Sequence, residues 1–441
     1  MDNQFVLLRH RRFLPLFITQ FLGAFNDNLY KTALSVLVAY AVWDIGGWRP
    51  EIVVSLAAGL FILPFMLFAP LAGQIADKYP RNRVMQVIKA VEIVIVCAAM
   101  VGVWLHSVPL LLIVLFAFGA HSAFFSPCKF SVLPQHLNDG ELIAGNALVN
   151  TGTYIAILFG SIFGGLLALA SVGIIVVCVL LLLVAVAGLI FSFYIPHAPS
   201  PSPDLTINSN LPAEMRQILV FARAQRNGVF TAMIGTSWFF FVGAMVLAQL
   251  PNYTKQVLGV DNIVLAFFMA VFSCGIALGG LVNDALLKSK VEATYVPFAA
   301  LVLTFFACDL YLASGIYHFV SPLLGDYLMT LPSFLAHTSG WRIVIDLFMI
   351  SVAGGLYVVP LKAIVQERAA PEMRARIIAA GCFLDAVFIL GASIIAIFML
   401  GVGFAIEHLF LLLAVGSAGM AYYLSRLAPT SMIRKIFRRQ H

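Results

Sequence analysis

Three polar side chains lie on one face of the first long apolar stretch of the chain. Gln20, Asp27 and Lys31 are separated by seven and four residues, which keeps them on one side of an α-helix. The flanking sequence is apolar from Phe13 to Trp43. An Asp or Lys at the centre of a membrane helix costs roughly 2.5–3.5 kcal/mol. We therefore expect this stripe to face protein or water, as one wall of a polar pathway.

Asp27 has two interpretations. It could bind the amine of a substrate, or it could pair with Lys31 one turn away and only stabilise the helix. We favour binding, because an ion pair buried for stability alone is seldom better than apolar packing. Of the flanking residues, Asn28 is the better candidate for a cavity and Asn26 for holding a neighbouring helix.

Four more polar residues are candidates for substrate binding: Lys129, Gln249, Lys362 and Asp385. Lys129 and Lys362 each follow a proline two residues earlier, and a proline inside a helix frees backbone groups that a polar ligand could use. The alternative is that both lysines only reach the inner membrane interface. Asp385 could complete a cavity or hydrogen-bond internally, and Gln249 could contact a headgroup or simply end a helix.

Other polar residues within apolar stretches are expected to be structural, namely Glu92, Asp309 and His121. The sequence contains no Ser-His-Asp set, no paired His-x-x-x-His and no nucleotide-binding loop. The six cysteines are scattered singly, without disulfide or metal-ligand spacing. We therefore expect no enzyme activity, no cofactor and no metal.

The composition requires a membrane protein. Hydrophobic residues make up 62% of the chain and charged residues only 10%, with a mean hydropathy of +1.00. A helix needs about 20 apolar residues to cross a bilayer. Twelve stretches qualify: 13–43, 51–72, 83–105, 108–128, 142–169, 172–195, 226–250, 262–284, 294–315, 341–366, 375–400 and 404–427. The fold class is thus all-α and polytopic, and the short alternating segments of a strand barrel are absent.

The basic residues predict the orientation of these spans. Most of the 26 Lys and Arg residues lie near the two termini or in alternate loops, and only Arg49, Lys255 and Arg342 fall on the other side. Basic loops stay in the cytoplasm, so both termini are expected inside. The net charge of +6 reflects this topology and does not indicate nucleic-acid binding.

The spans divide into two similar halves. Proline-rich residues 196–212 separate six spans from six, and a short motif recurs with a displacement of 207 residues. The two copies are Gly73, Asp77, Arg81 and Arg83, and Gly280, Asp284, Lys288 and Lys290. We therefore expect a six-helix bundle over 1–195, a cytoplasmic linker over 196–225 and a second bundle over 226–441, with a site between the bundles.

The loop from Gly73 to Arg83 resembles the signature loop of the major facilitator superfamily. The resemblance implies that the Gly allows two helices to approach, while the Asp and Arg latch the inner side of a carrier. An Asp can cap the N-terminus of a neighbouring helix, and basic residues can bridge to it. We therefore assign gating to Gly73, Asp77, Arg81, Arg83, Gly280 and Asp284.

Within that superfamily, three motifs together resemble the bacterial lysophospholipid transporters: 20–31, 125–130 and 354–362. The resemblance implies a monomeric carrier of the bacterial inner membrane. It would move lysophospholipids such as lysophosphatidylethanolamine from the outer to the inner leaflet, where a lysophospholipid acyltransferase would be its functional partner. Two alternatives remain at this stage: an exporter of a drug or siderophore, because one fold hosts many functions, and a membrane scaffold without transport.

Overall fold

The computed structural model describes residues 4–39, 50–168, 173–224, 228–287, 291–320 and 329–427. The side chains of 50–55, Asp139, Asn262, Asp284 and 318–320 lie outside this description. Nearly all described residues are helical, and eleven of their helices are long and apolar enough to cross a membrane. Helix α1 (Leu14–Ala39) is not among the eleven although it has 26 residues, because the polar stripe lowers its hydropathy.

The predicted spans overlap helices α1 to α6, α8 to α10 and α12 to α14, so the all-helical class is confirmed. Residues 40–43 of the first predicted span lie outside the described residues. The helices of the first half are α2 (Pro50–Lys78), α3 (Arg81–Trp104), α4 (Val108–His136), α5 (Leu142–Ala168) and α6 (Gly173–Phe193), with short turns η1 (Gln4–Arg9) and η2 (Asp139–Glu141).

The second half follows an additional helix, α7 (Leu211–Ala224), which lies within the predicted linker. The remaining elements are α8 (Val229–Asn252), the π-helical turn η3 (Tyr253–Val257), α9 (Asn262–Leu287), α10 (Val296–Val320), α11 (Leu331–Ala336), α12 (Thr338–Arg368), η5 (Pro371–Met373), α13 (Arg374–Gly401), α14 (Glu407–Leu424) and η6 (Ser425–Leu427).

The chain forms two compact units. The first comprises residues 1–229 and 365–386, and the second comprises 230–364 and 387–441. Helices α12 and α13 therefore each contribute to both units. The first unit takes in the start of α13 because that segment packs against α2, as described below.

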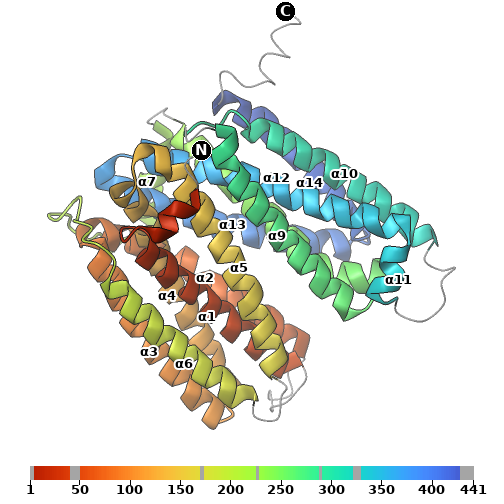
Figure 1. The fold of residues 1–441 in the computed structure, drawn as a ribbon, viewed down its shortest axis with the longest axis horizontal. Helices are drawn as coiled ribbons and strands as arrows, with labels where there is room; N and C mark the ends of the chain where they lie inside the picture. The colour runs from red at the N-terminus through yellow and green to blue at the C-terminus, as the bar shows by residue number, and fades with distance from the viewer. Residues whose placement is uncertain are drawn as a thin grey trace, which may run out of the picture. The chain divides into compact units, whose positions relative to one another are not determined.

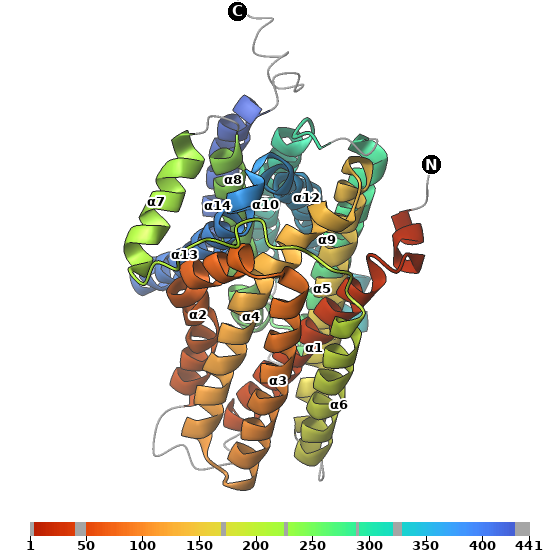
Figure 2. The same cartoon turned by 90° about the vertical axis from the view of Figure 1, so that its left-hand side faces the viewer.

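Close helix packing builds the first unit. Helix α1 packs against α5 and α6, and α3 packs against α4 and α6 (Figures 1 and 2). A Cβ atom on Gly160 of α5 would lie only 2.5 Å from the carbonyl oxygen of Phe25, and one on Gly164 only 2.6 Å from that of Leu29. Small residues allow membrane helices to approach in this way. The backbone of α1 is thus held tightly, which fixes the position of its polar stripe.

In the second unit, glycines also allow a close approach of two helices, α9 and α12. A Cβ atom on Gly279 would lie 2.0 Å from the carbonyl oxygen of Val352, and one on Gly355 would lie 2.2 Å from that of Ile276. Helices α10 and α14 also pack along each other (Figure 1). Gly280, a predicted gating residue, is buried at this crossing, 2.7 Å from the position of a Cβ on Gly355.

Candidate functional site

Among the residues of the α1 stripe, Asp27 has the contacts that bear most directly on ligand binding. Its side chain is 6% exposed, and Oδ2 accepts a hydrogen bond from the Ser122 hydroxyl on α4. The other oxygen, Oδ1, is buried and has no hydrogen-bond partner in the described part of the chain. A buried charged group without a partner is expensive, so the geometry leaves Asp27 with one oxygen free to accept from a ligand.

The other members of the stripe have different surroundings. Gln20 is buried, its Oε1 accepts from the Thr153 hydroxyl on α5 at 2.9 Å, and its Nε2 has no partner among the described groups. The Lys31 ammonium lies over the ring of Phe61, 5.5 Å from the centroid. In the described part of the chain no ion pair within 4.0 Å joins Lys31 to Asp27. The two charges still interact electrostatically, so the choice between a binding and a structural role for Asp27 stays a prediction.

The flanking asparagines differ in role. The Asn28 amide donates to the carbonyl oxygen of Ala24 in its own helix at 2.8 Å. The Asn26 amide donates across helices, to Glu92 Oε1 of α3 and to the carbonyl oxygen of Leu181 of α6, both at 3.0 Å. Asn26 therefore holds neighbouring helices.

Glu92 is the centre of a buried polar cluster in the first unit, consisting of Asn26, Lys89, Glu92 and His121. Its Oε2 accepts from the Lys89 ammonium at 2.7 Å, and His121 Nε2 of α4 lies 3.4 Å from the same oxygen. All four side chains are buried. Charges this deep persist only when paired, so the cluster is a structural support that joins α1, α3, α4 and α6.

The remaining predicted binding residues are spread over both units. Lys129 and Asp385 belong to the first unit, and Gln249 and Lys362 to the second. The Lys129 ammonium lies 4.8 Å from the centroid of the Phe130 ring, and the Lys362 ammonium 5.2 Å from that of Phe240. Gln249 Oε1 accepts from the Asn252 amide at 3.3 Å. All four side chains are half-buried, and whether they face one cavity stays a prediction.

Asp77, at the end of α2, caps the start of α13. Its Oδ1 accepts from the backbone N–H of Ala375, and its Oδ2 accepts from the backbone N–H of Arg376, both at 3.1 Å. The Arg81 and Arg376 side chains also donate to this carboxylate, at 3.1 and 3.3 Å. The negative charge thus sits at the positive end of the α13 dipole, between two guanidinium groups.

Gly73 makes this contact possible. A Cβ atom at Gly73 would lie 2.7 Å from the Cα of Arg376 and 2.9 Å from the Cβ of Ala379. Because residues four apart lie on one face of a helix, the glycine brings the backbones together and places Asp77 one turn later at the helix end. Arg83 is exposed, and the contacts of Asp77 given above do not include it. The Asp284 side chain, Lys288 and Lys290 lie outside the described residues.

The predicted linker forms hydrogen bonds to the end of α2 and the start of α3, next to the Asp77 contact. The Asp77 carbonyl oxygen accepts from the backbone N–H of Ser202 at 3.1 Å and from the Ser200 hydroxyl at 2.8 Å. Arg81 donates its backbone N–H to the carbonyl oxygen of Ala198 at 3.0 Å. Glu214 of α7 lies 3.7 Å from the Arg376 guanidinium. The predicted linker is therefore an integral part of the first unit.

A contact between α5 and the end of α12 was not predicted. Asn146 of α5 and Gln366 of α12 exchange two amide hydrogen bonds, at 2.6 and 2.9 Å, and both side chains are buried. Neither residue belongs to a recognisable motif, and a partner 220 positions away leaves no periodic signal. Ser122, Thr153 and Arg376 were missed for the same reason.

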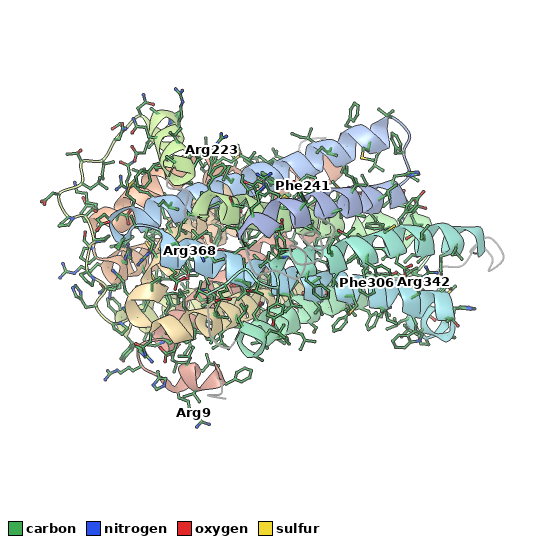
Figure 3. The ribbon with its side chains drawn as sticks, turned by 90° about the horizontal axis from the view of Figure 1, so that it is seen from above. Arg9, Arg223, Phe241, Phe306, Arg342 and Arg368 are labelled. Carbon is green, nitrogen blue, oxygen red and sulfur yellow. The ribbon has the colours of Figure 1, made fainter. Side chains whose placement is uncertain are left out.

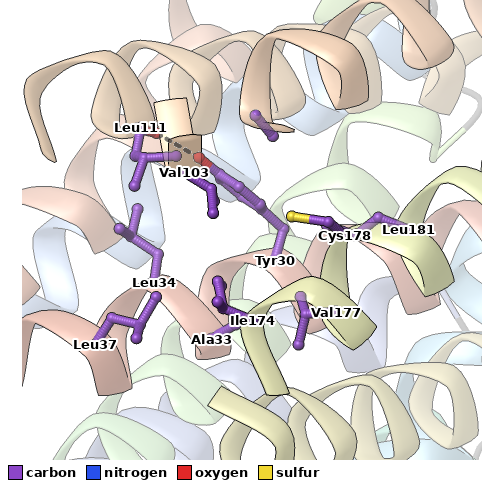
Figure 4. A pocket seen from close by; sticks show the side chains of 11 residues that line it. Tyr30, Ala33, Leu34, Leu37, Val103, Leu111, Ile174, Val177, Cys178 and Leu181 are labelled. Atoms are coloured by element: carbon purple, nitrogen blue, oxygen red, sulfur yellow. Dashed lines mark hydrogen bonds between the residues drawn. The ribbon is translucent and has the colours of Figure 1, made fainter. Parts of the chain in front are cut away.

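A pocket between α1, α3, α4 and α6 is almost entirely apolar (Figure 4). Its lining includes Leu34, Val103, Ile174 and Val177, and its one hydroxyl, that of Tyr30, already donates to the carbonyl oxygen of Leu111 at 2.8 Å. Such a pocket offers no partner for a charged headgroup. None of the predicted binding residues is among those that line it.

The family of this fold follows from a comparison with known proteins. Residues 16–381 match the family model of the Major Facilitator Superfamily. The chain belongs to this superfamily. It is thus a multi-pass membrane protein from a superfamily of transporters, as the sequence resemblance predicted.

Several relatives carry the name lysophospholipid transporter LplT. The protein of Serratia proteamaculans is 27% identical over 366 residues, which cover 82% of this chain and 81% of the relative. That of Salmonella schwarzengrund is 29% identical over 360 residues, which cover 80% and 79%.

Two solved structures share the fold. The crystal structure of the human organic anion transporter MFSD10 has a TM-score of 0.72 at 14% identity, covering 94% of this chain and 99% of that one. The proton:xylose symporter XylE has a TM-score of 0.69 at 11% identity, covering 95% and 96%.

Proposed function

We propose that this chain transports lysophospholipids from the outer to the inner leaflet of a bacterial inner membrane. Two observations support the proposal. Its relatives named LplT match about four-fifths of both chains, and α1 presents a buried carboxylate with one unpartnered oxygen. The unpartnered carboxylate oxygen is the observation that supports the binding mechanism, because a headgroup stripped of water needs compensating polar contacts inside the protein.

The geometry supports a direct role for Asp27. Ser122 holds one carboxylate oxygen, which leaves the other to accept from the amine of a phosphoethanolamine headgroup. Lys31, one turn along the same helix, or Lys129 on α4, would take the phosphate. Gln20, Asn28, Gln249, Lys362 and Asp385 would supply the remaining polar contacts. The single acyl chain would stay partly in the surrounding lipid.

The Asp77 contact would act as a gate on the cytoplasmic side. Capping of α13 by Asp77 would stabilise the closed inner side, and Gly280 with Asp284 would do the same in the second half. Breaking the cap would release the start of α13. The transported lipid would then be reacylated by an acyltransferase, and the carrier would work as a monomer.

A flux assay in proteoliposomes tests the proposal. Labelled monoacyl phosphoethanolamine should be taken up by the wild type, with strong competition from monoacyl lipids and weak competition from diacyl lipids. Removing the amine should weaken competition, and Asp27→Asn should abolish that amine preference. Asp204→Asn, which changes an exposed acid of the linker, is the matched control.

The outcome separates the alternatives. Equal competition by diacyl lipids, or an unchanged amine preference in Asp27→Asn, would remove the basis for the proposal. Transport of a drug-like or siderophore-like solute without lipid uptake would assign the chain to export. Unchanged behaviour of every Asp27 and Lys129 variant, without any flux, would favour a scaffold.

A further inference from the structure

The first unit contains a buried cation that the proposed lipid site does not use. Arg9 and Arg223 of this unit are exposed, and their side chains point away from the ribbon in Figure 3. Lys89 of α3, in contrast, is 0% exposed. Lysines are almost never buried to this degree unless they are paired, and a charge at membrane depth is costly.

Lys89 lies against α1, close to Asp27. A Cβ atom on Gly23 would lie only 2.6 Å from the Lys89 Nζ, and one on Gly188 of α6 would lie 3.6 Å from its Cδ. The two glycines thus make room for the lysine side chain between α1 and α6. Gly23 precedes Asp27 by four residues, and residues at this spacing are neighbours on one helix face, about 5–6 Å apart. The ammonium therefore lies within about one helical turn of Asp27.

Lys89 nevertheless does not pair with Asp27. In the ranges that the structure describes, no ion pair within 4.0 Å involves Asp27. The Lys89 ammonium donates instead to Glu92 Oε2 at 2.7 Å. Opposite charges attract strongly where water is excluded, so the bond to Glu92 is what keeps the ammonium from the free oxygen of Asp27.

The Glu92 carboxylate is itself held from two other helices. Its Oε1 accepts from the Asn26 amide of α1 at 3.0 Å, and His121 Nε2 of α4 lies 3.4 Å from its Oε2. Because these neighbours fix the carboxylate, they also fix the ammonium that it binds. Asn26 directly precedes Asp27, so the contact that orients Glu92 comes from the same turn of α1.

We propose that Glu92 is a positioning residue of the lipid site: it holds Lys89 and so leaves Asp27 available for the amine of the headgroup. This inference rests on the proposed transport function. Without Glu92, the Lys89 ammonium would bind Asp27 in place of the headgroup amine, because both are ammonium donors and the lysine stem is flexible. The pair of Glu92 and Lys89 would thus set the amine preference without touching the lipid.

A thermodynamic cycle on the purified full-length protein tests the arrangement without any lipid. In an otherwise wild-type chain, Asp27→Asn removes no ion pair and should change the unfolding temperature little. In the Glu92→Gln background the same substitution should lower it clearly, because it breaks the new contact between Lys89 and Asp27. Glu141→Gln, which changes the acid of the ion pair with Arg12, is the matched background and should behave as the wild type. Equal shifts in both backgrounds would overturn the inference.

Competition assays test the consequence for recognition. The readout is the ratio of competition by a monoacyl phosphoethanolamine lipid to competition by the same lipid without the amine, a monoacyl phosphate. Glu92→Gln should lower this ratio about tenfold, since one charged contact is lost, and adding Lys89→Met should restore it. A loss of stability alone would reduce the competition by both lipids and leave the ratio unchanged.

The double variant also decides the matter if Glu92→Gln alone fails to fold, because it leaves neither charge of the pair in the membrane. A folded double variant without amine preference would overturn the inference, since the pair would then take part in recognition itself. An unchanged ratio in Glu92→Gln would overturn it as well. Absence of lipid uptake by the wild type would instead refute the transport proposal, and the unfolding temperatures would still show whether Glu92 keeps Lys89 from Asp27.

Discussion

Asp77→Asn should weaken the contact between α2 and the start of α13 and shift the protein toward states in which the inner side is open. The substitution is nearly isosteric, so it leaves the packing around Gly73 unchanged. The Asn oxygen can still accept one backbone N–H from α13. It loses the charge that currently attracts the Arg81 and Arg376 guanidinium groups and the end of the helix dipole.

The magnitude can be estimated from the contacts. Asp77 accepts from two backbone N–H groups and two guanidinium groups, and its side chain is fully buried. A hydrogen bond to a charged group contributes about 1.5–3 kcal/mol, and a helix cap about 0.5–2 kcal/mol. If the variant loses the equivalent of one charged contact, the ratio of closed to open states should fall on the order of 10- to 100-fold.

The measurement is the rate of labelling of reporter cysteines placed on either side of the membrane, in a background without the six native cysteines. Labelling should fall at positions on the outer side and rise on the inner side. Arg83→Ala is the matched control, because Arg83 belongs to the same motif but is exposed. Its effect should stay within the range of ordinary surface substitutions, about 0.5 kcal/mol.

Unchanged labelling at both faces in Asp77→Asn would refute the gating role, even though the cap is present in the structure. Equal effects of Asp77→Asn and Arg83→Ala would also refute it. In that case the motif would act through the general charge of the loop instead of through the cap.

Three further predictions concern stability and can be checked by thermal unfolding of the purified protein. Asn146→Leu should destabilise by about 1–3 kcal/mol, because it leaves the Gln366 amide buried without a partner, and adding Gln366→Leu should recover part of the loss. Glu92→Leu should lower the free energy of unfolding by about 3–5 kcal/mol, because it leaves the Lys89 charge unpaired. The double variant Lys89→Met with Glu92→Leu should lose far less stability. Equal losses in the single and double variants would contradict the pairing. Gly355→Ala should lower the unfolding temperature by forcing α9 and α12 apart, while Gly315→Ala, with open space around it, should not.

Much of the fold was predictable because a long run of apolar residues is enough to identify a membrane-spanning helix. Runs of apolar residues must be helical in lipid, so the spans and their order follow from hydropathy alone. Helix α1 is the instructive case. Its polar stripe lowers its hydropathy, but the fixed spacing of Gln20, Asp27 and Lys31 still marks one face of a helix.

The contacts of the site were less predictable. The repeated Gly-x-x-x-Asp motif indicated a helix cap, and Asp77 makes one, but the sequence did not identify α13 as the helix that is capped. Ser122, Asn146 and Gln366 are single polar residues whose partners are distant in the chain. A side chain that pairs across helices has no local period, so only the packed structure reveals it.

The polar residues of α1 are divided among different neighbours, and this division bears on where a headgroup could bind. Gln20 bonds to α5, Asn26 to α3 and α6, and Asn28 to its own helix. The bonds of Gln20 and Asn26 to neighbouring helices anchor α1, whereas the bond of Asn28 stays within the helix. Asp27 is the acid of the series, and after its bond to Ser122 it keeps a buried oxygen without a partner among the described groups. An unsatisfied charged oxygen on a helix anchored this firmly is a preorganised acceptor, since binding a cationic headgroup there requires little rearrangement of the protein.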